Sequence, residues 1–588
     1  MPLPENKYTH LVYSISFLFL IIIFSLLRLQ VFKGKEYKII AGKNYVRIID
    51  ISPVRGEIYD RNYKTIVKNI PSMNLYFSPG KMKDLEKLIS FLSKEVSFSK
   101  IEIREIIYKN RYRLHNEILL IQNISHQKVV EISEQLNFFP SLSILSETSR
   151  KYYYKNHFTG YVGKINEHEY SKKKYEGYSM NSMLGKTGLE KYYEKTLRGE
   201  NGNKILQVDS SGRNLNFFKS DIEKKPKNGA DLILTIDNDL QEFIQNIIPQ
   251  NYRGAIVVMD VQTGGILSYM SNPVYDPNMF SGKITTDFWQ KILQDPAKPM
   301  LDRISQGSYP PASVYKIVPA MMGLENGFID INTKLSTCDG GMQVGNRYFK
   351  CWLHSGHGKL NVVNAIKYSC DTFFYDLSLN FKLEEFHDFT LSCMLTQKTN
   401  IDLPEERNGF FPTQKWYTDN YGQYFGIIGH KVNLSIGQGE ILTTPLQICA
   451  LYSAIANDGI WFQPHLLDKT VQGNMVDIFA PNVIELPIIR NNIQIIQKAL
   501  YKTVNEKYGT GKKAAVKNVK VFGKTGSAEN HMGKTTHAWF AGYATWEKPE
   551  IAFSIFFENE GHGGSIAAPF AKEIIEFWDS MKKIESEE

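Results

Sequence analysis

The chain has 588 residues, more than one hydrophobic core normally organises, so two or more domains are expected. Its formal net charge is +8, from 69 basic and 61 acidic residues, and the lysines are scattered without an arginine-rich stripe. This distribution gives no support to nucleic-acid binding, whose usual signature is a concentrated basic face.

An apolar segment lies close to the N-terminus. Residues 11–27 are all apolar, aromatic or small, and further apolar residues extend the run to position 32. At about 1.5 Å per residue, a helix of this length crosses a hydrocarbon core of about 30 Å. No small-x-small cleavage site follows in residues 33–37. We therefore predict a cytoplasmic tail over 1–10 and a transmembrane helix over 11–32, rather than a cleaved signal peptide or a buried soluble helix.

The next part of the chain divides into two regions. Residues 55–62 read R-G-E-I-Y-D-R-N, a pattern that fits a strand and a turn. Residues 80–220 mix short amphipathic helices with charged loops, and residues 223–229 combine charge, proline and glycine, as linkers do. The sequence thus predicts one domain over 33–222 and a second over 229–582.

The second domain has an α/β (α+β) pattern. Thr263-Gly264-Gly265 separates two apolar runs, which is a β-hairpin signature, and residues 567–581 predict a closing amphipathic helix. The segments predicted to be strands are 254–259, 266–270, 518–526, 537–544 and 551–558. We expect a five-stranded antiparallel sheet flanked by helices, with the helical part inserted between the second and third strands.

Three short motifs follow one another in this domain. They are Ser313-Val314-Tyr315-Lys316, Ser369-Cys370-Asp371 and Lys524-Thr525-Gly526. A serine and a lysine three residues apart face the same way on a helix, so Lys316 can take a proton from Ser313. A hydroxyl is a weak nucleophile at neutral pH and needs a base of this kind beside it.

Context separates these motifs from accidental copies. The S-x-x-K pattern also begins at Ser78, Ser97, Ser125, Ser171 and Ser580, and K-T-G recurs at 186–188. Ser313 follows a Pro-Pro pair and opens an apolar run, which predicts a buried helix with the Ser313–Lys316 pair at its solvent end. Lys524 follows a strand-like alternation, whereas Lys186 leads into a charged helix. The second K-T-G is therefore assigned to the site.

The order S-x-x-K, S-x-[ND], K-T-G resembles the transpeptidase domain of penicillin-binding proteins and the serine β-lactamases. The segment over 55–62 resembles the opening of the pedestal domain of class B penicillin-binding proteins. The second motif has Asp371 in place of the commoner asparagine, and in this feature it resembles the elongation-specific penicillin-binding protein 2 branch. The resemblance implies a pedestal over 33–222 and a transpeptidase domain over 229–582.

The resemblance also implies an activity and roles for residues. The enzyme would be a D,D-transpeptidase that cross-links peptidoglycan stem peptides during wall elongation and is acylated by β-lactams. Ser313 would attack the carbonyl between terminal D-alanines, with Lys316 as the base. Ser369 would relay a proton to the leaving amine, and Lys524 would add positive potential. Asp371 accepts hydrogen bonds only when ionised, so it would pair with Lys316 or Lys524.

Substrate binding is assigned to the residues that follow Lys524. The resemblance implies that the hydroxyls of Thr525 and Ser527, on either side of Gly526, bind the terminal carboxylate of the substrate. Backbone N–H groups of Ser313 and Ser527 would form the oxyanion hole.

Three of the five cysteines cluster with a histidine in the sequence. Cys338, Cys351, His357 and Cys370 supply thiolates and an imidazole, the ligand types that zinc prefers. Penicillin-binding protein 2 of some Gram-negative bacteria carries a metal at matching places, and Asp339 is an alternative to Cys338 in that correspondence. A disulfide or free core cysteines are the alternatives to a structural zinc. Cys393 and Cys449 lie in apolar helical contexts and are predicted to be core residues.

Orientation and partners follow from the same resemblance. Positive charges after the apolar segment outnumber Lys7 before it, and this count alone would keep the large domain in the cytosol. Because the related enzymes act outside the membrane, and long domains translocate regardless of charge, we predict a single-pass inner-membrane protein with a periplasmic catalytic domain. A RodA-type glycosyltransferase is the implied partner. A membrane-anchored serine β-lactamase and a β-lactam sensor are the alternatives.

Overall fold

The computed structural model describes residues 6–33, 46–95, 99–110, 117–121, 123–173, 176–179, 182–207, 224–280, 286–422, 426–530 and 535–587. The chain forms two compact units. One comprises Met1–Arg55 with Arg198–Gly229, and the other comprises Gly56–Leu197 with Ala230–Glu588. The first unit holds the N-terminal helix, and the second holds all three motifs.

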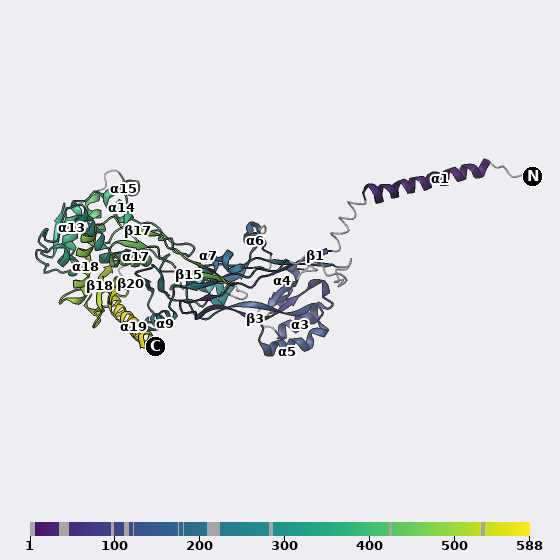
Figure 1. The fold of residues 1–588 in the computed structure, drawn as a ribbon, viewed down its shortest axis with the longest axis horizontal. Coiled ribbons are helices and arrows are strands. Elements are labelled where there is room, and N and C mark those ends of the chain that lie inside the picture. Colours follow the sequence, from purple (N-terminus) through teal and green to yellow (C-terminus); the bar gives the residue numbers. More distant parts are fainter. Residues whose placement is uncertain are drawn as a thin grey trace, which may run out of the picture. The chain divides into compact units, whose positions relative to one another are not determined.

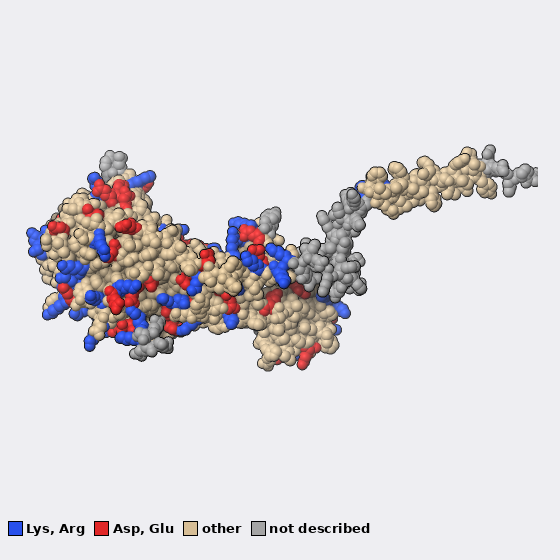
Figure 2. All heavy atoms as spheres, in the orientation of Figure 1, with Lys and Arg blue, Asp and Glu red and all other residues tan. Residues whose placement is uncertain are grey.

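The predicted N-terminal helix is present in the first unit. Helix α1 (Asn6–Leu27) continues as one π-helical turn, η1 (Arg28–Phe32), drawn in purple in Figure 1. The stretch Tyr8–Phe32 has a mean hydropathy of 2.4, and none of its most apolar window is buried among the residues that the structure describes. Its surface carries almost no charge in Figure 2. This helix is long and apolar enough to cross a membrane.

The first unit also contains a two-stranded antiparallel ribbon. Strand β1 (Val46–Ile51) pairs along its whole length with β8 (Gly202–Gln207). Isolated bridges from Glu200 to Lys227 and from Asn203 to Lys224 continue the pairing. Part of the predicted linker over 223–229 is therefore hydrogen-bonded to this ribbon.

The N-terminal part of the second unit is built on a seven-stranded sheet that the sequence did not predict. The strand order is β16-β15-β9-β2-β3-β4, with β5 also paired to β3, and β2 runs parallel to β9. The strands are β2 (Ile58–Tyr59), β3 (Thr65–Phe77), β4 (Ile118–Ile121), β5 (Leu142–Tyr152), β9 (Asp231–Leu234), β15 (Leu467–Gln472) and β16 (Met475–Ile478). Segments from both predicted domains thus share one sheet.

Short helices complete this part. The apolar sides of α3 (Leu85–Glu95), α4 (Lys100–Asn110) and α5 (His126–Gln135) form a small core with β3 and β4. The remaining elements are β6 (Val162–Lys164), α6 (Glu167–Lys173), β7 (Met183–Gly185), α7 (Gly188–Tyr192) and α8 (Glu194–Arg198). The helix predicted after the first K-T-G is therefore two short helices, and Lys186 forms an ion pair with Glu169 on α6.

The predicted five-stranded antiparallel sheet is confirmed. Its order is β11-β10-β20-β19-β18, with the helical part inserted between β11 and β18. The strands are β10 (Gly254–Asp260), β11 (Ile266–Asn272), β18 (Lys520–Ala528), β19 (His537–Thr545) and β20 (Pro549–Phe557). Side chains alternate along β10, so Val257 packs in the core that contains α17 (Pro445–Ala456), and Val258 packs with α9 (Asn238–Ile247) and α19 (Ala567–Glu587). Helices thus cover both faces.

The inserted region is helical, with two small strand pairs. Besides α17, its helices are α10 (Thr286–Gln294), α11 (Ile317–Glu325), α12 (Val362–Lys367), α13 (Asp371–Leu379), α14 (Leu383–Ser392), α15 (Gln414–Tyr421), α16 (Ile427–Leu434) and α18 (Arg490–Asn505). The pairs are β12 (Gly341–Val344) with β13 (Arg347–Lys350), and β14 (Ile460–Phe462) with β17 (Val483–Glu485). Figure 2 shows acidic and basic side chains interspersed over the visible surface of this part.

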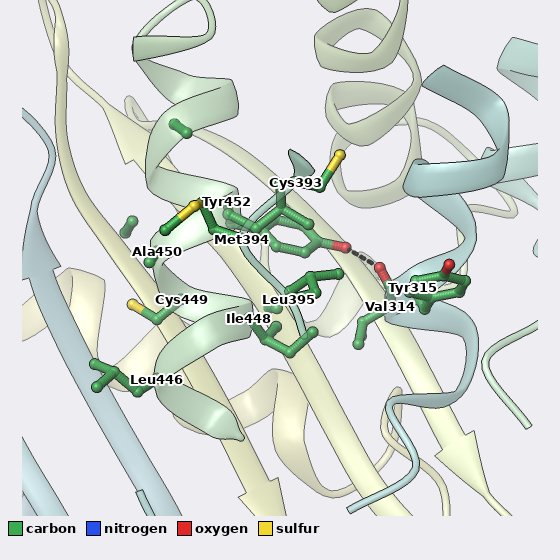
Figure 3. Packing of buried hydrophobic residues seen from close by; sticks show 14 of the residues in the cluster. Val314, Tyr315, Cys393, Met394, Leu395, Leu446, Ile448, Cys449, Ala450 and Tyr452 are labelled. Atoms are coloured by element: carbon green, nitrogen blue, oxygen red, sulfur yellow. Dashed lines mark hydrogen bonds between the residues drawn. The ribbon is translucent and has the colours of Figure 1, made fainter. Parts of the chain in front are cut away.

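Helix α17 is the buried centre of the part of the second unit that carries the three motifs. All of its residues are buried, and Thr444 with Gln447 forms a capping box at its N-terminus. Tyr452 donates a hydrogen bond of 2.8 Å to the carbonyl of Val314, as Figure 3 shows. Cys393 and Cys449 are fully buried in this core, as predicted, and burial raises the pKa of the Cys393 thiol to about 12.

Asp60 joins the predicted turn over 55–62 to helix α9. Its fully buried carboxylate accepts hydrogen bonds from the backbone N–H groups of Asn62 (2.9 Å), Lys64 (2.7 Å) and Asn238 (3.2 Å). Burial raises the pKa of Asp60, and these three donors oppose the rise. The carboxylate therefore connects the β2–β3 turn to the first turn of α9.

We predict that Asp60→Ala lowers the free energy of unfolding by about 3 kcal/mol, because it leaves buried N–H groups without acceptors. Urea unfolding of the full chain in detergent, followed by circular dichroism, measures the change. Asp239→Ala is the matched control, since the Asp239 carboxylate is half-exposed and pairs with Lys64 at the surface. It should cost less than about 1 kcal/mol. Equal losses in the two variants would contradict this role of Asp60.

Candidate active site and metal cluster

Ser313 lies in a tight helical turn at the start of a buried helix. It belongs to the 3-10 turn η6 (Ala312–Lys316), which leads directly into α11. In a 3-10 turn, residues three apart are aligned, so Ser313 and Lys316 share one side. Ser313 is half-buried, but Lys316 is fully buried. The predicted solvent-end position is therefore wrong for the lysine.

The backbone before Ser313 has an unusual conformation. Ala312 has a φ of +51°, a left-handed conformation that is uncommon for residues with a side chain. Its N–H donates to the carbonyl of Gly437 at 2.8 Å. A Cβ on Gly437 would lie 2.2 Å from the carbonyl oxygen of Ala312, so only glycine permits this approach. The contact fixes the turn that presents Ser313.

Ser369 occupies the sharp turn between α12 and α13. Its φ of +55° is also left-handed, and its N–H donates to the carbonyl of Ile366 at 3.1 Å. Cys370 precedes α13, and Asp371 is its first residue. The turn directs the groups of the second motif toward Lys316. Strained backbone of this kind persists where the surroundings determine it strongly, as they do at functional sites.

The Ser369 hydroxyl lies between the two lysines of the motifs. Lys524 Nζ donates to Ser369 Oγ at 2.7 Å and to the carbonyl of Thr525 at 3.0 Å. Lys316 Nζ donates to Asp371 Oδ1 at 2.6 Å, to the Ser369 carbonyl at 2.9 Å and to Ser369 Oγ at 3.4 Å. The three motifs therefore meet in one hydrogen-bonded network.

The two lysines differ in their electrostatic surroundings. Burial lowers the pKa of Lys524 well below its ordinary value, and the charge of Lys316 adds to this effect. Burial also raises the pKa of Asp371, whereas the adjacent Lys316 opposes the rise. Lys316 thus lies against a carboxylate, whereas Lys524 donates to a hydroxyl and a backbone carbonyl.

Strand β18 packs closely against the turn that carries Ser313. A Cβ on Gly526 would lie 3.2 Å from the Pro311 carbonyl oxygen and 3.3 Å from Val314 Cγ1, which leaves little room for a side chain. Thr525 Oγ1 donates to Thr510 Oγ1 at 2.9 Å. Successive side chains of a strand point to opposite faces. Lys524 and Gly526 therefore face the turn that carries Ser313, and Thr525 with Ser527 forms a second row.

Several neighbours of Ser527 had not been predicted. The N–H of Gly563 donates to Ser527 Oγ at 3.2 Å, and Gln438 Nε2 donates to the Ser527 carbonyl at 3.3 Å. His562 is an exposed loop residue, and its Nδ1 lies 3.4 Å from Ser527 Oγ. These residues come from distant segments and match no motif, so the sequence held no signal for them.

Cys338, Cys351, His357 and Cys370 come together as one cluster. One ligand atom from each residue lies within 4.8 Å of all the others, and the three cysteines are buried. His357 Nδ1 lies 3.7 Å from Cys338 Sγ and 3.5 Å from Cys351 Sγ. Ligands at about 2.0 to 2.3 Å from a tetrahedral ion lie under about 4 Å apart. The two imidazole–sulfur distances are of this size, and three thiols with an imidazole are chemically suited to a metal ion. All five cysteines are free thiols in the structure.

The sulfur atoms of the cluster perturb one another strongly. A hydrogen bond with Cys370 is the largest cause that lowers the pKa of Cys351 to about 2, and the same contact raises the pKa of Cys370. Burial lowers the pKa of His357, but the Cys351 and Cys338 sulfurs outweigh it and raise the value. The cluster thus stabilises thiolate, the form that binds metals.

The cluster and the hydrogen-bonded network of the three motifs share Asp371. The N–H of Asp371 donates to Cys351 Sγ at 3.4 Å. Its Oδ2 accepts a hydrogen bond of 2.9 Å from the N–H of Trp352, the residue after Cys351. Asp371 therefore contacts Lys316 on one side and the cysteine loop on the other.

Comparison with known proteins identifies the family. Residues 254–576 match the penicillin binding protein transpeptidase domain, and residues 50–234 match the penicillin-binding protein dimerisation domain. The chain belongs to the class B penicillin-binding proteins. It is a serine-type transpeptidase of that family, as its motifs predicted.

Relatives are similar over almost the whole chain. Peptidoglycan D,D-transpeptidase MrdA of Haemophilus influenzae is 29% identical over 94% of this chain and 88% of its own length. The protein of the same name from Acinetobacter baumannii is 30% identical over 94% of this chain and 84% of its own length. Both predicted domains therefore belong to the similarity.

Solved structures show the same fold. Penicillin-binding protein PBP2 of Helicobacter pylori, in complex with MreC, has a TM-score of 0.80 and 29% identity, covering 90% of this chain and 99% of its own. Pseudomonas aeruginosa PBP2 in complex with WCK 5153 has a TM-score of 0.69 and 27% identity, covering 90% and 96%. The resemblance to the penicillin-binding protein 2 branch extends to the three-dimensional structure.

Proposed function

We propose that this class B penicillin-binding protein cross-links peptidoglycan stem peptides during wall elongation, with Ser313 as its nucleophile. The observation that carries the proposal is the network in which both buried lysines converge on Ser369, beside the turn of Ser313. Separately encoded segments supply each part of this network. Nucleophilic catalysis by a serine requires such a set of polar groups within hydrogen-bond reach.

The proposed reaction has two steps. Ser313 Oγ attacks the carbonyl carbon between the terminal D-alanines, and Lys316, acting as a neutral amine, takes the hydroxyl proton. The tetrahedral oxyanion receives hydrogen bonds from the N–H groups of Ser313 and Ser527. Ser369 then delivers a proton to the amine of the departing D-alanine. The rest of the donor peptide remains bound to Ser313 as an ester. The amine of a neighbouring stem peptide attacks this ester, releases Ser313 and forms the cross-link.

The remaining site residues support these steps. Asp371 holds Lys316 through the 2.6 Å contact, and Lys524 positions the Ser369 hydroxyl through the 2.7 Å contact. Thr525 and Ser527 bind the terminal carboxylate, and Gly526 lets β18 approach the nucleophile turn. β-Lactams occupy the same site and acylate Ser313.

The alternatives gain less support. A serine β-lactamase or a β-lactam sensor shares the three motifs. Residues 50–234 of this chain match the dimerisation domain, and most of the chain is similar to transpeptidases. Neither alternative function requires these two features. Turnover of the acyl-enzyme separates the activities, since a lactamase hydrolyses it quickly and a transpeptidase retains it.

We predict that Ser313→Ala abolishes covalent labelling by fluorescent penicillin, because the ester oxygen is removed. Gel fluorescence of the purified full chain measures the labelling, and circular dichroism verifies folding. Ser580→Ala is the control, since Ser580 also begins an S-x-x-K pattern but lies exposed on α19. It should label as the wild type does. Labelling of the Ser313 variant at wild-type stoichiometry would refute the assignment, and rapid release of penicillin from the wild type would indicate a β-lactamase.

We also propose that the cysteine cluster holds one structural zinc ion. Cys338, Cys351, His357 and Cys370 offer three sulfurs and an imidazole, the closed set typical of structural zinc sites. Bound zinc would cross-link the loop before Trp352 to the turn that carries Ser369. Because the ligands are separated in the unfolded chain, binding energy would add to folding stability.

We predict about one zinc per chain in protein purified without a metal-affinity tag, measured by elemental analysis. His357→Ala should lose the ion and lower the melting temperature by about 5 °C or more, because a ligand is missing. His354→Ala is the matched control in the same exposed loop and should retain zinc. A metal-free wild type with a disulfide between two of the clustered cysteines, seen by mass spectrometry, would overturn the zinc assignment.

The membrane arrangement follows from the proposed substrate. Helix α1 anchors the chain in the inner membrane, and the catalytic domain lies in the periplasm, where peptidoglycan is assembled. A lone transpeptidase needs glycan strands to join, so a RodA-type glycosyltransferase in the same membrane is the proposed partner. Co-purification of the two proteins in mild detergent tests this pairing.

We predict that added protease degrades the large domain in intact spheroplasts, because everything after about residue 40 lies outside the cytosol. Immunoblotting for the C-terminal region reads out the result, and a cytosolic protein in the same cells controls for lysis. Complete protection of the domain until the membrane is broken would reverse the orientation.

A further inference from the structure

The hydroxyl of Ser527 is the less engaged of the two hydroxyls assigned to the substrate carboxylate. Thr525 directs its proton to Thr510 Oγ1 at 2.9 Å, and Thr510 in turn lies 3.5 Å from the carbonyl of Lys367. Ser527 Oγ accepts an N–H from Gly563, which leaves its own proton free to donate. An ionised carboxylate has two oxygens with about four lone-pair sites, so it can accept from a further donor beside these two hydroxyls.

His562 is placed to supply this further donor. Its Nδ1 lies 3.4 Å from Ser527 Oγ, which is long for a hydrogen bond, since such N···O distances centre near about 2.9 Å. The two groups therefore bind each other weakly, and each keeps capacity for a ligand. The imidazole is exposed, so a ligand can reach it.

The backbone around His562 is fixed against the catalytic sheet. Its carbonyl accepts hydrogen bonds from the N–H groups of Ser565 (3.0 Å) and Ile566 (2.9 Å) in the turn before α19. A Cβ on Gly563 would lie 2.1 Å from the Trp539 carbonyl oxygen and 2.4 Å from that of Gly526, so the loop lies flush on β18 and β19. The position of the imidazole beside Ser527 is thus set by packing rather than by a loose loop.

We propose that His562 determines specificity by binding, together with Ser527, the carboxylate of the donor peptide or of a β-lactam. Nδ1 donates to one carboxylate oxygen when it carries a proton, and Ser527 Oγ donates to the other. The ligand class is a carboxylate anion at the end of a peptide or on a β-lactam ring system. This inference rests on the proposed function, since it concerns the same site.

The test compares a penicillin with its neutral ester. Acylation of Ser313 in the full-length protein by benzylpenicillin and by benzylpenicillin methyl ester is followed by mass spectrometry at several concentrations. His562→Ala should lower the second-order acylation constant for the free acid about tenfold, the size expected for one hydrogen bond to a charged group. The loss should fall on the apparent binding constant, with the limiting acylation rate and the constant for the ester within about twofold of the wild type.

Two further variants separate binding from loop structure. His562→Asn carries an amide N–H near the place of Nδ1 and should recover part of the discrimination between acid and ester. Ser565→Ala removes the 3.0 Å hydrogen bond from Ser565 Oγ to the His562 carbonyl in the same turn and should leave both constants unchanged.

Each other outcome overturns the inference. An equal loss for acid and ester in His562→Ala would show that His562 only maintains the loop. Unchanged constants for both compounds would show that it takes no part in recognition. A wild-type protein that benzylpenicillin fails to acylate at Ser313 would instead refute the proposed function, and the inference with it.

Discussion

The burial of two lysines side by side is the constraint on which the catalytic part depends. Lys316 and Lys524 are both fully buried, and an ammonium group without partners costs several kcal/mol in such a place. The two lysines instead donate hydrogen bonds to the carboxylate of Asp371, the hydroxyl of Ser369 and backbone carbonyls, which offset this cost. These groups come from three separate segments. The site therefore forms only when η6, the α12–α13 turn and β18 have all packed together.

The same constraint connects the cysteine cluster with catalysis. Asp371 has to keep its charge beside Lys316, yet burial and the nearby Cys351 sulfur both raise its pKa. The N–H of Trp352 stabilises the carboxylate from the far side. A dication bound among the thiolates would offset their negative charge and would relieve this repulsion. Asp371 thus connects the cysteine cluster to Lys316, because it contacts both.

The sequence predicted those features that depend on local pattern. The five strands follow from apolar runs and the Thr263–Gly265 turn, and the two K-T-G copies were separated by their neighbours. The burial of Lys316 was missed because it depends on Asp371, 55 residues further along the chain. The seven-stranded sheet was missed for a similar reason, since β2 and β9 are short and pair across the whole intervening domain. His562 carried no signal, because only the packing of its loop on β18 brings it to Ser527.

One strand performs two tasks because its side chains alternate. Along β18, Lys524 and Gly526 face the turn of Ser313, and Thr525 and Ser527 face the loop of His562. Strand β18 also ends the sheet, and among the described residues no strand pairs with its outer edge. An open edge offers backbone donors and acceptors to an extended peptide. Pairing along that edge would set the register of a peptide relative to the side chains on both faces of β18. The fixed spacing of the strand would then keep the scissile carbonyl at Ser313 while the terminal carboxylate rests at Ser527.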